Sequence, residues 1–573
     1  MASIKRGGDV DRGHHESLSP ATDRAHLLGE LHTLSGSKII DRILAADNPR
    51  GLVQALPSED FFWLIKKVGE DDCLPVLELA SEQQWQYVLD LEIWRRDRLD
   101  SEEISAWLWR LQQADSPRLM QWLFGEGQAL AYHHVFKNLE VIILEEDEDA
   151  FEIPEGFFSL DGIFYIRAKD PEYREKVEEL IRSMAEEDLT RYQALLQGLM
   201  GFVPTETEEN MYRMRNVRLA EHGFLPFEEA LSAYAPLDPQ ELVKETIPSL
   251  STLMDDDEIR GLVPVSPLQQ SGAANLLTET AAKKISDPLL LDRIRLEFAG
   301  LCNQVLSADG IRVEEMEDLV RVSCKVARYL NLGLERICGR DLAKTEALLE
   351  GHPLLSIFRV GIGLSLKVKW EAERWLKGSW FYGQGLSPGF WGEQWGGMLS
   401  GLLGRIPRFY TGFFEGEEYK DFEWVTELGD AMEALRSMMV LDGLLERLAE
   451  RFSRDAGLLR SPEITFHPLL FNLWGRAVLG LDPGFSGISP AQTKEFFGRI
   501  RGAVKGPPYD ISSLEDAFVK DIASHAPALD TETQNILNDT LRLVWRQFAE
   551  EYAWVSLRDL SSEYLRFLTI ETS

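Results

Sequence analysis

The sequence predicts a mainly α-helical fold, and three observations lead to this prediction. A pattern of Ser followed by Glu at residues 58–60 returns at 81–83 and at 101–103, as expected for an α-helical repeat that forms a superhelix. Apolar residues recur every three or four positions over 425–452. Short β-prone runs are confined to 140–166. We therefore expect an N-terminal helical repeat, a small acidic α/β insertion and a larger C-terminal helical domain.

Composition and charge limit the function classes. The chain of 573 residues is 44% hydrophobic and 27% charged, which is typical of a folded protein. Its formal net charge of −35 argues against nucleic acid and anionic membranes as partners, because phosphate binding needs a basic surface. The four cysteines lie far apart and form no Cys-x-x-Cys pair, which favours a reducing compartment: Cys73, Cys302, Cys324 and Cys338.

The sequence shows no targeting signal. Residues 1–24 contain charged and small residues without an apolar core, so we expect a disordered lead and not a signal peptide. The most apolar later stretch, 353–366, is interrupted by Arg359 and is shorter than the roughly 20 apolar residues of a spanning helix. We expect no membrane span and a cytoplasmic location.

Residues 25–139 are predicted to be the helical repeat domain. In each repeat the Ser would accept hydrogen bonds from the free N–H groups of the following turn, and the Glu would face the positive end of the helix. Six of the fifteen tryptophans lie here. We interpret them as filling the seam between stacked helices, with an aromatic binding groove as the alternative. They are Trp63, Trp85, Trp94, Trp107, Trp109 and Trp122.

The chain shows two resemblances to known families, one over a short segment and one over its whole length. Residues 56–60, Leu-Pro-Ser-Glu-Asp, followed by Leu64 and Ile65, resemble the start of a repeat in the intracellular N-terminal domain of MgtE-type magnesium transporters. The resemblance implies a superhelix and nothing about magnesium, because the sequence shows none of that family's transmembrane segments. The whole chain, through the run at 213–224, resembles an uncharacterised bacterial family of unknown function.

Residues 140–235 are predicted to be the α/β insertion. The runs 141–144, 151–153 and 163–166 favour short strands, with a hairpin turn at Asp161-Gly162. Nine acids and no base lie in the strip 140–161. They would suit a divalent cation or a basic partner, but we favour a solvated acidic loop, because charge runs usually serve solubility.

Two helical elements complete the insertion. A long helix is expected from Asp170-Pro171 to about Met200, with Asp170 as its N-cap. Residues 212–234 are expected to form two helices that meet at Gly223-Phe224. The Pro- and acid-rich segment 236–270 then predicts a linker.

Residues 271–573 are predicted to form the C-terminal helical domain. Over 358–370 apolar and polar residues alternate as in a strand, yet one helical face is also kept, and we favour a helix. Helix starts are expected at Ser489, Ser512 and Thr531, the last two with capping boxes. The final helix carries one apolar side that should pack on the rest of the domain: Leu537, Leu541, Val544, Trp545, Phe548 and Tyr552.

The segment 370–397 is the strongest candidate for binding. It combines five tryptophans with seven glycines, and we predict a partner or ligand surface at Trp380, Tyr382, Trp391 and Trp395. The alternative is a loop that covers the core of the domain. The segment also contains Gly-x-Ser-x-Gly, but Pro388 follows the serine and has no N–H to serve as an oxyanion donor.

No motif assigns catalytic, cofactor or metal-binding residues. Phosphate loops, dinucleotide-binding glycines and His-Glu-x-x-His are all missing from the sequence. The leading hypothesis is therefore an interaction or regulatory scaffold that binds a protein partner through its helical repeats. The alternative is an enzyme or small-ligand-binding protein with a pocket near 370–397.

Overall fold

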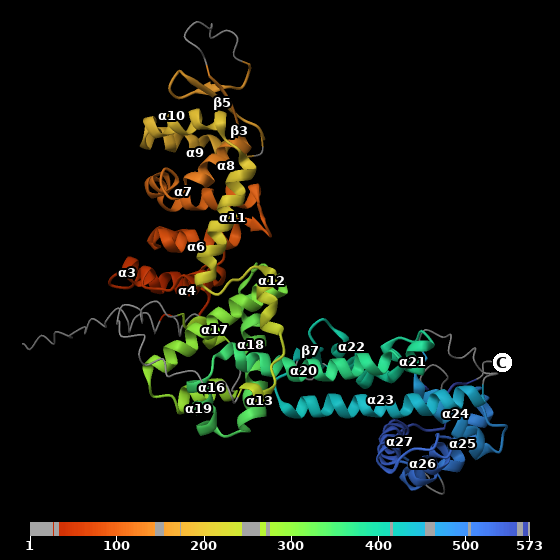
Figure 1. The fold of residues 1–573 in the computed structure, drawn as a ribbon. Helices are drawn as coiled ribbons and strands as arrows, with labels where there is room; N and C mark the ends of the chain where they lie inside the picture. Colours follow the sequence, from red (N-terminus) through yellow and green to blue (C-terminus); the bar gives the residue numbers. More distant parts are fainter. Residues whose placement is uncertain are drawn as a thin grey trace, which may run out of the picture. The chain divides into compact units, whose positions relative to one another are not determined.

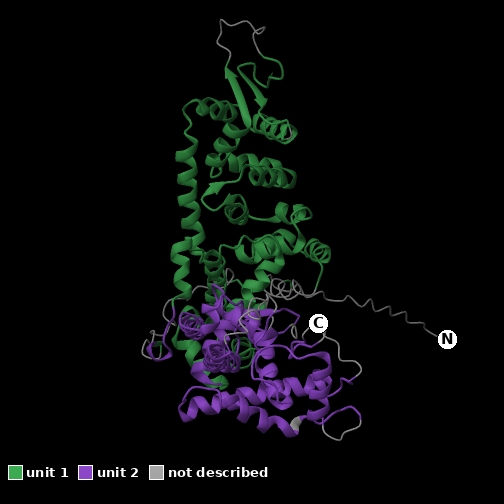
Figure 2. Ribbon diagram, turned by 90° about the vertical axis from the view of Figure 1, so that its right-hand side faces the viewer, with its two compact units in different colours: residues 1–235, 242–327, 340–358 green, residues 236–241, 328–339, 359–573 purple. Residues whose placement is uncertain are grey.

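The computed structural model has the predicted mainly α-helical fold. It describes residues 27, 34–143, 154–171, 173–242, 264–270, 275–412, 416–452, 464–501, 506–557 and 565–570. The contacts within the chain divide it into two units (Figure 2). Unit 1 comprises residues 1–235, 242–327 and 340–358, and unit 2 comprises 236–241, 328–339 and 359–573.

The first part of unit 1 contains the predicted helical repeat (Figure 1). Its helices pack on their successors or on the helix after next, so each buries its apolar face against a near neighbour in the sequence. Five of the six tryptophans predicted to fill the seam are buried, and Trp109 is half-buried. The helices are α2 (Gly36–Leu44), α3 (Pro49–Gln54), α4 (Ser58–Val68), α5 (Leu74–Leu79), α6 (Glu82–Glu92), α7 (Ser101–Leu123) and α8 (Gln128–Asn138).

The three predicted helix starts are confirmed, but only one of the three serines caps its helix. Ser81 forms a capping box with Gln84 at the start of α6. Ahead of α7 the cap is Asp100, whose carboxylate accepts from the first-turn amides, and ahead of α4 it is Pro57, without a side-chain bond. A cap needs extended backbone at its own position, and Ser58 and Ser101 are already helical.

The insertion contains a small antiparallel sheet in the order β3-β5-β4. The turn at Asp161 and Gly162 joins β4 to β5, as predicted, and the carboxylate of Asp161 accepts the amides of Ile163 and Phe164, both at 2.9 Å. The predicted run 151–153 lies outside the described residues. The strands are β3 (Leu139–Ile143), β4 (Phe158–Ser159) and β5 (Phe164–Ala168).

The predicted long helix after Asp170 was wrong. The chain forms α9 (Arg174–Glu187) and α10 (Leu189–Gly198), and no side chain caps the start of α9. The break falls at Asp188, which has extended backbone and whose carboxylate accepts the amides of Thr190 and Arg191. A local side-chain cap at Asp188 thus starts a new helix within the span that was predicted to be one helix.

Two helices meet at Gly223 as predicted, with a φ of +82° at that glycine, and the first of them begins earlier than predicted. The elements are α11 (Pro204–Glu221), α12 (Phe227–Ala230) and the 3-10 helix η3 (Leu231–Tyr234), each of which packs against α17 or an earlier helix. The remaining helices of this part of the chain are α13 (Pro239–Leu242), α15 (Ser266–Gln270), α16 (Leu276–Lys283), α17 (Pro288–Asp309), α18 (Met316–Cys338) and α19 (Leu342–Gly351).

The predicted linker at 236–270 is described only in part, and the predicted domain boundary stays a prediction. Leu242 and Val265 on either side of the undescribed residues 243–263 are buried in unit 1. The helix favoured over 358–370 is confirmed as part of α20 (Leu354–Leu376). Gly361 and Gly363 allow this helix to approach neighbouring backbone, since a Cβ at Gly361 would lie 2.0 Å from the carbonyl oxygen of Tyr329.

Unit 2 is built around two long helices, α23 and α27, which pack against each other. All six predicted apolar residues of α27 are buried. Asp530, and not Thr531, caps this helix, whereas Ser489 caps α25 as predicted. The helix after Ser512 begins at Glu515 without a side-chain cap. The elements are α21 (Trp380–Gly383), η5 (Pro388–Trp391), α22 (Gly392–Leu403), β6 (Arg408–Tyr410), β7 (Tyr419–Asp421), α23 (Val425–Arg451), α24 (Phe466–Leu479), α25 (Pro490–Ile500), η8 (Ser512–Leu514), α26 (Glu515–Ala523) and α27 (Thr531–Tyr552).

Within the described ranges, no one helix has the length and apolarity of a membrane span. Helices α19 and α20 pass that test only as a pair, and the pair is bent by 118°.

Candidate functional site

The junction of α4, α6, α11 and α17 in unit 1 gathers many buried polar side chains. The run at 213–224 adds half-buried polar side chains from α11 and from the residue after it. Both oxygens of the Asp90 carboxylate accept from the guanidinium of Arg218, each at 2.7 Å, and the backbone carbonyl of Asp90 accepts from Arg215 at 2.6 Å. Asp90 is buried, so this bidentate pair fixes α11 to α6.

At the end of α11, His222 pairs with Glu59 of α4. Its Nδ1 lies 2.8 Å from the Glu59 carboxylate, and its ring meets the edge of Tyr87 with 4.7 Å between ring centres. The side chain of Asn303 donates to the carbonyl of His222 at 2.6 Å. Burial lowers the pKa of His222, but the hydrogen bond and charge of Glu59 outweigh burial and raise it above its ordinary value.

Asp60, the neighbour of Glu59, holds the start of α15. Its carboxylate accepts the backbone amides of Val265 and Ser266, at 3.0 and 2.8 Å, across more than 200 residues of sequence. Burial raises the pKa of Asp60 to about 6 although these amides favour the charged form. Asp60 is therefore a long-range cap, and no solvent reaches it.

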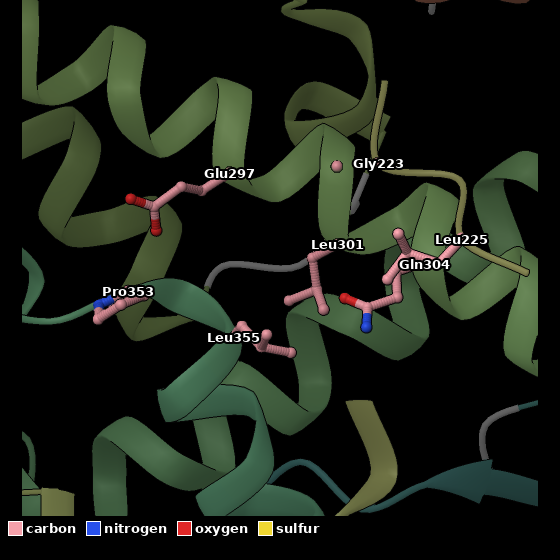
Figure 3. A pocket seen from close by; sticks show the side chains of 8 residues that line it. Gly223, Leu225, Glu297, Leu301, Gln304, Pro353 and Leu355 are labelled. Atoms are coloured by element: carbon pink, nitrogen blue, oxygen red, sulfur yellow. The ribbon is translucent and has the colours of Figure 1, made fainter. Parts of the chain in front are cut away.

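A cavity of about 220 Å³ lies beside this network (Figure 3). Gly223, the residue after His222, forms part of its wall where it crosses α17. A Cβ on Gly223 would lie 2.6 Å from the backbone of Gly300, so a side chain at position 223 would push the turn after α11 away from α17. The cavity is lined by Gly223, Leu225, Glu297, Gly300, Leu301, Gln304, Pro353 and Leu355.

Glu297 is the acidic group of the cavity. One of its oxygens accepts the amide of Leu354 at 2.7 Å, which caps α20, and the other lies 3.4 Å from Nε of Arg293. Arg293 donates from its other nitrogens to the carbonyls of Leu349 and Glu350 at the end of α19. Burial raises the pKa of Glu297. The pair thus joins the end of one helix to the start of the next.

The chemistry available to the remaining polar groups is limited. Burial raises the pKa of Cys73 to about 12 and that of Cys302 further, so both thiols are poor nucleophiles. The part of the chain that the structure describes contains no group of three or more His, Cys, Asp or Glu able to hold a metal ion.

The four aromatic residues predicted to bind a partner differ in exposure. Trp391 and Trp395 are buried against Phe466, whereas Tyr382 is 64% exposed. Trp380 is half-buried, with its ring edge on Phe390. The segment therefore supplies core residues to unit 2, and a binding role for the exposed Tyr382 stays a prediction.

Asp442 of α23 holds this aromatic segment in place. Its carboxylate accepts the amides of Trp380 and Phe381, at 3.1 and 2.8 Å. Burial raises the pKa of Asp442, although these hydrogen bonds favour its charged form.

The acidic strip 140–161 is described only at its ends. Residues 144–153, with most of the acids, lie outside the described residues. Glu140 pairs with Arg167 at 2.6 Å, and Asp161 closes the hairpin turn. A divalent-cation site in this strip stays a prediction.

The model of a protein family described as Family of unknown function (DUF6178) matches residues 16–571. The chain belongs to this family. No curated protein and no solved structure matches the chain. The resemblance of this DUF6178 protein to MgtE-type repeats at 56–60 stays a prediction.

Sequence reasoning missed most of the junction. It identified Glu59 and Asp60 only as a helix start, and His222 and Gly223 only as part of a family run. For Glu297 the sequence offers only the pair with Arg293 four residues earlier, because the helix start that Glu297 caps follows it by more than 50 residues. One feature of the sequence could have indicated the junction. Gly223 follows a charged helix, and a glycine at such a turn often permits the close approach of another backbone segment.

Proposed function

We propose that this DUF6178 protein is a scaffold that binds a protein partner through the outer face of α11. The main support for this proposal is the burial pattern of α11. Within α11, which is described throughout, Leu219 is the one buried residue, while Met214 and Val217 are 57% and 60% exposed. A surface helix normally places its large apolar residues inward.

The exposed residues lie on one side of the helix. Val203 at the start of α11 is exposed, and positions 203, 214 and 217 repeat at multiples of the helical turn. Met200 in the preceding turn is also exposed. Met214 and Val217 are neighbours on this side, and adjacent exposed apolar residues are typical of an interaction surface; Met adapts to partners of different shape. We expect the apolar side of a partner helix to bind there.

A catalytic role for the polar junction has less support. Its buried ionisable groups are engaged in bonds that hold elements together: Glu59 with His222, Asp60 with the amides of 265–266, and Asp90 with Arg218. An acid or base must face a substrate to act in catalysis. The alternative predicted from the sequence, a pocket near 370–397, stays a prediction.

The proposal is tested with the full chain carrying Met214→Glu and Val217→Glu. Photo-crosslinking from position 210 in cells identifies the partner, and the purified pair is then measured by titration. We expect the double variant to bind at least tenfold more weakly, because two charges would enter an apolar interface, while its thermal melt stays unchanged. Leu543→Glu, at an exposed position of α27, is the control and should bind normally. Equal binding by the double variant would refute the proposal.

A further inference from the structure

We infer that the cavity between α17 and the start of α20 in unit 1 binds a small, mainly apolar molecule that carries a primary ammonium group. This inference is independent of the proposed partner surface on α11. It rests on the size of the cavity, the chemistry of its walls and the side chains that are already engaged in other bonds.

The size of the cavity suits one small ring with a short substituent. Its volume is about 220 Å³. A closed apolar cavity of roughly 150 Å³ in another protein binds benzene, whereas this one is partly open to solvent. The additional space admits a one-carbon arm with a polar end.

The walls are apolar over most of the surface. Leu225 comes from the turn after α11, Leu301 from α17, and Pro353 and Leu355 from the start of α20. Gly223 and Gly300 add backbone surface without side chains, which leaves the space open. Such walls bind a hydrocarbon body through its displacement from water.

The polar side chains of the cavity can accept hydrogen bonds, but few of their donors are free. Figure 3 shows Glu297 and Gln304 on either side of Leu301. The amide nitrogen of Gln304 already points to the hydroxyl of Ser232 at 3.4 Å, and Arg293 donates to the carbonyls at the end of α19. A ligand must therefore supply the donor.

Glu297 selects a cation among the possible donors. Among the described residues its Oε1 makes no close hydrogen bond, since Nε of Arg293 lies 3.4 Å away, beyond the usual length of a charge-assisted bond. An ammonium placed there would gain a short charge-assisted bond, whereas a neutral donor would gain less. Arg293 weakens this attraction, because its Nε lies 3.4 Å from the same oxygen, but two of its nitrogens are held by the carbonyls of Leu349 and Glu350, so it does not close on Oε1.

Gly300 offers a way to fill the cavity without unfolding the protein. The nearest atom to a Cβ built there is the Cα of Gly223 at 4.0 Å, so the first carbon fits. A larger side chain at position 300 would extend into the cavity. Gly300→Ala and Gly300→Leu therefore form a graded series in which the available volume decreases.

The experiment titrates the full chain with benzylamine and with ethylbenzene, which has the same shape but a methyl group in place of the ammonium. Calorimetry on the wild type should show saturable binding of benzylamine and at least tenfold weaker binding of ethylbenzene. Glu297→Gln retains an oxygen to cap Leu354, and it should reduce the affinity for benzylamine at least tenfold while that for ethylbenzene stays unchanged. Gly300→Leu should abolish both.

Three results would overturn the inference. The first is the failure of benzylamine to bind the wild type saturably, and the second is equal binding by Gly300→Leu. The third is equal affinity for the two probes with no effect of Glu297→Gln, which would mean an apolar cavity without recognition of a cation. If Gly300→Leu proves unstable in a thermal melt, Gly300→Ala replaces it, with at least threefold weaker binding expected.

Discussion

In unit 1 the carboxylate of Asp60 accepts two backbone amides of a distant segment, and in unit 2 the carboxylate of Asp442 does the same. Their surroundings differ. Asp60 lies in a network of paired charges, whereas Asp442 holds a segment whose other contacts are aromatic rings around Trp391. The comparison shows that the same type of carboxylate cap is held in place by paired charges in unit 1 and by packed aromatic rings in unit 2.

The largest expected effect tests the packing side of this comparison. Trp391 is 1% exposed and contacts the rings of Trp375, Phe381, Phe390 and Phe466. Trp391→Ala should lower the free energy of unfolding of unit 2 by about 3 to 5 kcal/mol, because it leaves a cavity in the core. Hydrogen exchange of α22 and α24 measures this loss.

The exposed Tyr382 provides the control for Trp391. Tyr382→Ala should change stability by less than about 0.5 kcal/mol. A stable Trp391→Ala variant would show that the rings of unit 2 contribute little, and the comparison between the units would fail.

A smaller effect is expected from a buried ion pair in unit 1. Lys66 lies 2.8 Å from Glu92, and both side chains are almost fully buried. Lys66→Met should cost about 3 kcal/mol, because it leaves the Glu92 charge buried without its partner. Adding Glu92→Gln should restore more than half of that loss, and hydrogen exchange of α4 and α6 measures both variants. Strictly additive losses would show that the two side chains are not coupled.

The smallest expected effect is the pH dependence that Asp60 gives to unit 1. Its pKa is about 6 in the folded chain, against 3.8 for an unperturbed aspartic acid in the unfolded chain, so the folded form binds more protons between these values. The stabilisation is therefore present below pH 3.8 and is lost as the pH rises through 6. Between about pH 4.5 and 6.5 the loss is about 2 kcal/mol.

Asp60→Asn removes this titration while keeping an oxygen for one of the two amides. As the pH rises from about 4.5 to 6.5, the protection of α4 in the wild type should therefore fall by about 2 kcal/mol relative to that in the variant. Asp442→Asn gives the matched measurement in unit 2, read from the protection of α23. A constant difference for Asp60→Asn across this range would contradict the raised pKa.

The local features of the chain were open to prediction from the sequence alone. The mainly α-helical class, the starts of α4, α6 and α7, the hairpin turn at Gly162 and the buried side of α27 follow from contacts within four residues. Helix periodicity, caps and turns depend on neighbours in the sequence, so they can be recognised before the fold is known. Even there Asp188 interrupted the single helix predicted from Asp170 to about Met200, because its side chain caps a second helix.

Only the tertiary structure decided which residues meet across the chain. His222 finds Glu59 across 163 residues, and Glu297 caps a helix that starts 57 residues later. The same holds for the aromatic segment, where composition left a surface and a core as alternatives and packing buried Trp391 and Trp395. A charge or a ring has no preferred partner until the backbone places one within a few ångströms, since dispersion falls steeply with distance and water and salt weaken the attraction between separated charges.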